Sequence, residues 1–159
     1  MTTPTHADRT TATPGPTDVV GARAIAQLVD AAVSLVLFVL VGGLAALALG
    51  GAALVRSSPV SAIWAVGPLA MLLGGLAAGS VPIALEWAWD GMTVGKRLLG
   101  IRVVPIDGGH LGFGAVLTRN LLAGIDAAFF YLVGLTAMAT SPHRQRLGDR
   151  VAGTVVVRS

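Results

Sequence analysis

The chain has 159 residues, of which 54% are hydrophobic and only 12% are charged, with a formal net charge of +3. Soluble domains carry about 25% charged residues, so this composition and a mean hydropathy of +0.78 indicate a membrane protein. Cysteine is absent, which excludes disulfides, thiolate nucleophiles and cysteine-type zinc sites. The basic residues flank apolar stretches instead of forming a soluble patch, so membrane topology accounts for them and no nucleic-acid binding is expected.

The chain begins with a polar segment. Met1–Val20 is rich in Thr and Pro and offers no face that could be buried. We therefore expect residues 1–21 to form a disordered tail and residues 22–157 to form a membrane domain. The apolar run Leu28–Val55 is too long for a secretory signal peptide.

A first membrane helix is predicted over roughly Ala24–Gly50, because a span needs about twenty apolar residues. Arg23, Gln27 and Asp30 follow one another at helical spacing, which places them on one helix face. A charge within an apolar run is costly and usually faces a cavity or a partner. Asp30 is therefore a candidate ion or proton ligand with Arg23 as its charge partner. The alternative is a buried pair that fixes helix packing.

A second membrane helix is predicted over roughly Val60–Trp89. Trp64 and Trp87 would lie about 34 Å apart along its axis, which suits the aromatic belts at two membrane interfaces. Gly75 and Gly79 predict a close helix–helix contact, either within the chain or between copies.

The segment from Asp90 to Gly114 is expected to leave the lipid. Gly91–Arg97 departs from a phosphate-binding loop in its glycine spacing and in the Arg at its end. We expect it instead to bring its basic residues, Lys96 among them, to lipid headgroups. Two β-prone runs, Ile101–Val104 and Thr154–Val157, could pair as a small sheet at the membrane surface.

Phe113–Thr140 is apolar but contains Arg119 and Asp126, so one uniform span would bury charge. The alternative is a pair of shorter helices that break near Asp126. A single span would divide the Lys and Arg residues six against five, whereas a hairpin that returns to its starting side divides them ten against one. Because positive residues concentrate in the cytoplasm, the sequence favours a re-entrant or tilted hairpin with both termini cytoplasmic.

Catalytic and metal-binding patterns are not apparent. His6, His110 and His143 lie far apart in the sequence, and no Ser–His–Asp or paired-carboxylate arrangement stands out. We therefore expect no enzyme activity, no metal and no cofactor. Asp149 lies between two arginines and either forms a local salt bridge or reaches back to Arg23.

Several segments, in this order, resemble the RDD family of bacterial and archaeal membrane proteins. These segments are Arg23 with Asp30, Gly95–Val104, and Arg146–Asp149 with Ala152–Val157.

The arginine and two aspartates that give this family its name match Arg23, Asp30 and Asp149. The resemblance covers Ala22 to Val157, with a departure at Val94, where similar proteins often have proline. It implies an integral membrane domain proposed to act in transport, with cation–proton exchange suggested for some members.

The predicted fold is thus an all-α membrane protein with two full transmembrane helices, a short re-entrant or tilted helical hairpin and a small cytoplasmic β element. The predicted function is a transport component of the cell membrane, handling a cation or protons. The alternative is a non-transporting accessory or structural subunit whose charges stabilise the fold or bind a partner. Two spans are few for an alternating-access machine, so transport would require a homo-oligomer or a membrane protein partner. The candidate residues are Arg23, Gln27, Asp30, Glu86 and Asp149, with Arg119 and Asp126 as a second charge pair.

Overall fold

The computed structural model describes residues 19–54, 59–129, 132–141 and 144–159. The predicted tail therefore lies almost entirely outside the described residues, as does the loop around Arg56.

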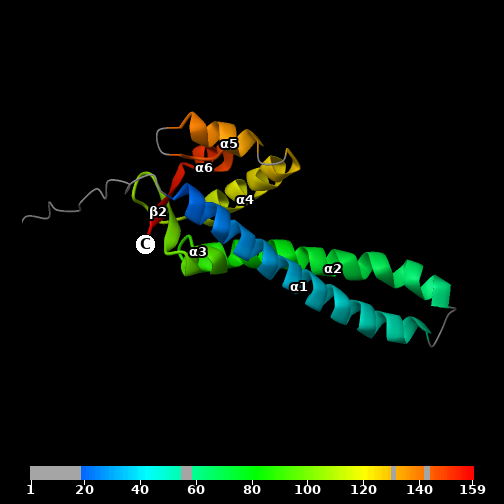
Figure 1. Cartoon of the computed structure of the whole chain (residues 1–159). Helices are drawn as coiled ribbons and strands as arrows, with labels where there is room; N and C mark the ends of the chain where they lie inside the picture. Colours follow the sequence, from blue (N-terminus) through cyan, green and yellow to red (C-terminus); the bar gives the residue numbers. More distant parts are fainter. Residues whose placement is uncertain (1–18, 55–58, 130–131, 142–143) are drawn as a thin grey trace, which may run out of the picture.

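Two long helices form an extended pair that dominates the molecule (Figure 1). Helix α1 covers Val20–Leu54 and helix α2 covers Pro59–Ala88. Both contain a segment long and apolar enough to cross a membrane, and only 6% and 11% of the two apolar windows are buried within the protein. Apolar helices that form the core of a soluble protein would be largely buried, whereas exposed leucine and valine are suited to lipid. The prediction of two membrane-length helices is confirmed.

Small residues allow α1 and α2 to pack closely. A β-carbon at Gly74 would lie only 2.7 Å from the carbonyl oxygen of Phe38, and one at Gly42 would lie 3.2 Å from that of Ala70. A β-carbon added at Gly75 or Gly79 would have no such neighbour within 4 Å among the residues that the structure describes. The predicted contact at these two glycines is therefore wrong within the chain, because the neighbouring Gly74 lies on the face of α2 that packs against α1. The alternative, a contact between copies, stays a prediction.

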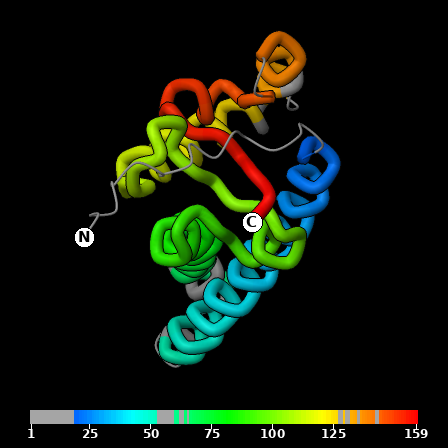
Figure 2. The backbone as a smooth tube through the Cα atoms, turned by 90° about the vertical axis from the view of Figure 1, so that its left-hand side faces the viewer, coloured from blue at the N-terminus to red at the C-terminus, as the bar shows by residue number. Residues whose placement is uncertain are grey.

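Short helices and two strands form a compact polar unit at one end of the long helix pair. It contains the short helix α3 (Val94–Leu98), strand β1 (Ile101–Pro105), helix α6 (Leu147–Val151) and strand β2 (Thr154–Arg158). The strands pair antiparallel, with Val103 opposite Val156, which confirms the predicted pairing. Figure 2 shows β2 passing between the α1–α2 pair and the C-terminal helices. The inward-facing side chains of Ile101, Val103 and Val156 form a small core with Val116.

The ambiguous apolar stretch forms two helices. Helix α4 covers Phe113–Ala128 and helix α5 covers Leu132–Ala139. The described residues of this stretch therefore do not form one continuous helix, and α4 ends two residues beyond the predicted break at Asp126. On the outer face of α4, Phe113, Leu117, Leu121 and Ile125 are spaced four apart and exposed.

Candidate functional site

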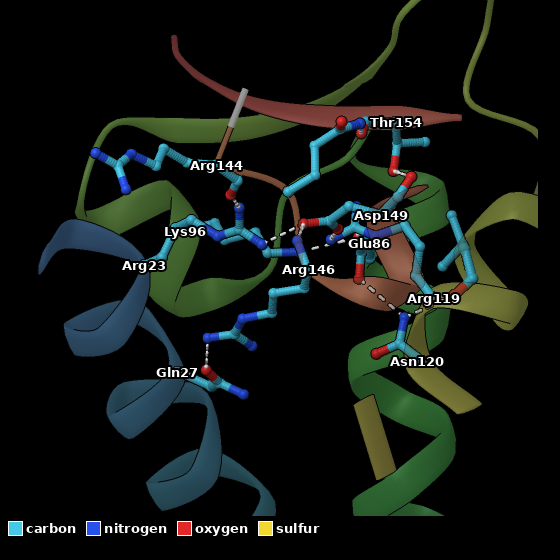
Figure 3. Close-up of polar contacts among 12 residues, drawn as sticks. Arg23, Gln27, Glu86, Lys96, Arg119, Asn120, Arg144, Arg146, Asp149 and Thr154 are labelled. Carbon is cyan, nitrogen blue, oxygen red and sulfur yellow. Dashed lines mark hydrogen bonds and ion pairs between the residues drawn. The ribbon is translucent and has the colours of Figure 1, made fainter. Parts of the chain in front are cut away.

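Charged side chains from five helices meet where α1 begins and α2 ends (Figure 3). We call this group the charge cluster, and its members are Arg23 from α1, Glu86 from α2, Lys96 from α3, Arg119 from α4 and Asp149 from α6.

Asp149 connects the C-terminal segment to two other helices. Its Oδ2 lies 2.5 Å from Nη2 of Arg23, and its Oδ1 lies 3.1 Å from Nη2 of Arg119. The backbone N–H of Arg146 donates a further hydrogen bond to Oδ2 over 3.1 Å. Burial alone would raise the pKa of Asp149, but the guanidinium groups of Arg119 and Arg23 outweigh it and hold that pKa below its ordinary value. The predicted reach of Asp149 back to Arg23 is thus present.

Glu86 gathers the remaining charges of the cluster. Its Oε1 lies 2.9 Å from Nζ of Lys96 and also 2.9 Å from Nη1 of Arg119. Its Oε2 accepts a hydrogen bond of 3.1 Å from the amide nitrogen of Asn120. Glu86 is only 2% exposed, so it is a buried member of the charge cluster.

Asp30 fixes α3 against α1. Its Oδ2 accepts a hydrogen bond of 2.5 Å from the hydroxyl of Thr93, and its Oδ1 accepts one of 2.7 Å from the N–H of Gly95. Thr93 is also the N-cap of α3. A β-carbon at Gly95 would collide with the backbone of Ala26, so this close contact requires glycine. These contacts hold α3 directly on the first membrane helix.

This attachment carries Lys96 inward. Its side chain is 15% exposed and reaches Glu86, so the predicted headgroup contact is wrong for this residue. The neighbouring Arg97 does lie exposed, with its guanidinium 5.1 Å from the centre of the Trp89 ring. Burial lowers the pKa of Lys96 to about 8, although the charge of Glu86 acts in the opposite direction.

The two charge pairs predicted from seven-residue spacing are not formed among the described residues. Arg23 pairs with Asp149 in place of Asp30, since groups about 10 Å apart along one helix find nearer partners on other elements. Arg119 likewise pairs with Glu86 and Asp149. Asp126 is buried, and its Oδ1 accepts a 2.5 Å hydrogen bond from the N–H of Gly134. Its Oδ2 has no hydrogen-bond partner in the part of the chain that the structure describes.

A cavity of about 160 Å³ lies among these groups. Gln27 also lines it, and its side-chain oxygen accepts a 2.6 Å hydrogen bond from Nη2 of Arg146. Among the residues that the structure describes, the charged side chains around the cavity are four acids and four bases, so their formal charges sum to zero. They are Asp30, Glu86, Asp126 and Asp149, with Arg23, Lys96, Arg119 and Arg146.

All seven candidate residues predicted from the sequence line the cavity, but the sequence missed other members of the site. Lys96, Thr93, Asn120 and Arg146 received no role in it. Thr93 three residues before Lys96 is an N-cap signal, and it could have revealed the short helix α3. Nothing in the spacing shows that α4 would bring Asn120 to Glu86.

Comparisons with known proteins show which sequences this chain is similar to. The RDD family matches residues 18–153 of the chain. A protein of Bacillus subtilis (strain 168), named uncharacterized protein YckC, is 33% identical over 78 residues, which are 46% of this chain and 52% of that protein. The matched region thus spans about half the length of this curated relative. No solved structure matches the chain.

Proposed function

The chain belongs to the RDD family, and from this premise we propose that it is a multi-pass protein of the cell membrane that exchanges a small monovalent cation for protons. The observation that carries the proposal is the charge-balanced cavity at one end of two membrane-length helices. Ionisable groups at such a position commonly mark ion or proton pathways.

The sheet supports a topology with both termini in the cytoplasm. Strands β1 and β2 precede and follow the α4–α5 segment, and they are hydrogen-bonded to each other. On the proposed topology both strands lie on the same side of the membrane, and α4 and α5 return to the side from which they started. Helices of 16 and 8 residues are also too short for two ordinary spans.

The outer surface of this segment supports a tilted or re-entrant hairpin. The exposed stripe of Phe113, Leu117, Leu121 and Ile125 faces away from the polar cluster, to which the same helix contributes Arg119. An amphipathic helix of this kind lies with its apolar face in the membrane and its polar face away from lipid. The cavity would then lie near the cytoplasmic surface.

The balance of charges around the cavity supports exchange of a cation for a proton over cation binding without proton release. With four acids and four bases ionised, the cavity carries no net charge, so a cation that enters creates one unneutralised positive charge. Such a charge is costly in a buried site. Release of one proton from a cavity group removes this cost, which would couple cation entry to proton release. Because two spans are few for alternating access, we propose that several copies of this chain complete the pathway.

A second candidate function is favoured by the contacts of Asp149. Its two oxygens hold arginines from α1 and α4, so it fastens the C-terminal segment to the membrane helices. A purely structural subunit would need such a connection and no ion movement.

The test is ion movement in liposomes that contain only the purified protein. An imposed pH gradient should drive uptake of Na⁺, K⁺ or Li⁺, and protein-free liposomes should show none. The matched variant Asp90→Asn, which alters an exposed ion pair with Arg102, should transport at the rate of the unsubstituted protein. Stable, correctly inserted protein that moves none of these ions would contradict the exchange proposal and leave the structural function.

A further inference from the structure

The amine of Lys96 has an unusual position among the charged groups of the cavity. Lys96 is the single lysine of the chain, and its side chain lines the cavity. Its Nζ shares one oxygen, Oε1 of Glu86, with the guanidinium of Arg119. Two cations thus compete for the same acceptor.

Of the two cations that share Glu86, Lys96 is the one that can lose its charge, and the groups around it explain why. Glu86 faces it from α2, Arg119 from α4 and Asp30 from α1. On β1, Arg102 lies at the surface in an ion pair with Asp90. On α3, Arg97 follows Lys96 in the sequence and stacks on Trp89.

Arginine keeps its proton at any pH that proteins experience, so Arg119 remains charged. If Lys96 becomes neutral, Glu86 still has the charge of Arg119 and the hydrogen bond from Asn120. Loss of the lysine proton therefore leaves no isolated carboxylate. Burial favours this loss, since it lowers the pKa of Lys96 to about 8, and a lysine in this range is partly neutral near physiological pH.

We infer that Lys96 is the proton-exchanging group of the cavity, so that one monovalent cation enters as its ammonium gives a proton to water. The net charge of the cavity is zero before the exchange, with Lys96 protonated. It is zero again afterwards, when the cation replaces the proton. This inference rests on the proposed exchange function and assigns that function to one residue.

The single lysine allows a direct test. Protein labelled with ¹⁵N or ¹³C only at lysine has one side-chain NMR signal, and its titration can be followed in lipid nanodiscs. With a large organic cation such as N-methylglucamine as the only salt, the midpoint should lie near pH 8. At equal ionic strength, Na⁺, K⁺ or Li⁺ should move that midpoint to lower pH as its concentration rises. A midpoint at 10.5, the ordinary value, or one that none of these ions moves, would overturn the inference.

Two variants extend the test to transport. Lys96→Arg keeps the positive charge but cannot release a proton, so it should reduce the rate of exchange at least tenfold. Lys96→Gln is permanently neutral, so any ion movement that remains should lose its dependence on pH between neutral and alkaline conditions. If Lys96→Arg exchanges ions at the rate of the unsubstituted protein, the inference is wrong and the exchange function stands. If the unsubstituted protein moves no ions, the exchange function fails, whatever the lysine signal shows. Should either variant fail to fold, the lysine titration in the unsubstituted protein still decides.

Discussion

Asp149 shows how much of this fold depends on a single carboxylate. It forms ion pairs with Arg23 on α1 and Arg119 on α4, two arginines that lie almost a hundred residues apart in the sequence. All three side chains are buried. Removing one partner of a buried ion pair leaves a charge without compensation, which costs more than the pair contributes when intact.

Replacing Asp149 with Asn should therefore lower the free energy of unfolding by about 3–5 kcal/mol. The measurement is thermal unfolding in detergent. The control is Asp90→Asn, because Asp90 is 65% exposed and its pair with Arg102 spans 3.7 Å. Exposed pairs contribute about 0–1 kcal/mol, so this variant should unfold close to the unsubstituted protein.

Two further comparisons make this prediction specific. Arg23→Gln combined with Asp149→Asn should recover part of the lost stability, because Arg119 keeps Glu86 as a partner. The difference between the unsubstituted protein and Asp149→Asn should also shrink in acid. A carboxyl whose pKa is lowered by folding stabilises the fold above its ordinary value of 3.8, and this contribution is lost as the pH falls further. Equal unfolding temperatures for the two proteins at neutral pH would contradict this account of Asp149.

At the scale of helices, the contact between α1 and α2 depends on which glycine faces the partner. A β-carbon at Gly74 would meet the backbone of Phe38, whereas Gly75 faces open space. Gly74→Ala should therefore weaken the helix pair by about 1–3 kcal/mol, the usual cost of overpacking. Gly75→Ala serves as the control and should be neutral or slightly stabilising, because Ala favours helix over Gly. Unfolding temperatures in the opposite order would show that the helices pack in a different register.

The elements differ in how far the sequence predicts them. The apolar runs of α1 and α2 and the β-branched runs Ile101–Val104 and Thr154–Val157 carry their own signals, and these four elements form close to the predicted bounds. Gly75 and Gly79 show the limit of such patterns, because small residues also occur at Gly42 and Gly74 and only the packed helices reveal which of them touch.

The sequence predicted which residues belong to the candidate site better than it predicted the contacts between them. Burial cost alone marks Asp30 as a residue that needs a partner, and helical spacing places Arg23 and Gln27 on the same face. Which partner each one finds depends on where α3 and α4 lie. Asp30 receives Thr93 and Gly95 because α3 docks beside it, and no spacing along the chain contains that information.

At the scale of the whole molecule, the paired strands and the distribution of positive charge lead to the same topology. Single cysteines are a clean probe, because the natural chain contains none. Ser159→Cys should be protected from an impermeant thiol reagent on intact cells, and Ser57→Cys, which lies outside the described residues, should be labelled. Permeabilised cells provide the control, since both positions should then react. Labelling of both positions from outside would contradict the proposed topology, in which α4 and α5 return to the side from which they started.

In the proposed exchange, the charge-balanced cavity takes up one cation for each proton that it releases. The most direct measurement follows both ions in the same liposomes, with a pH indicator for protons and an isotope or fluorescent indicator for the cation. The account predicts that the two movements occur together, in opposite directions and in a one-to-one ratio, in the unsubstituted protein and in Asp90→Asn. Cation movement without proton counter-movement, or a lack of both in stable and correctly inserted protein, would contradict it.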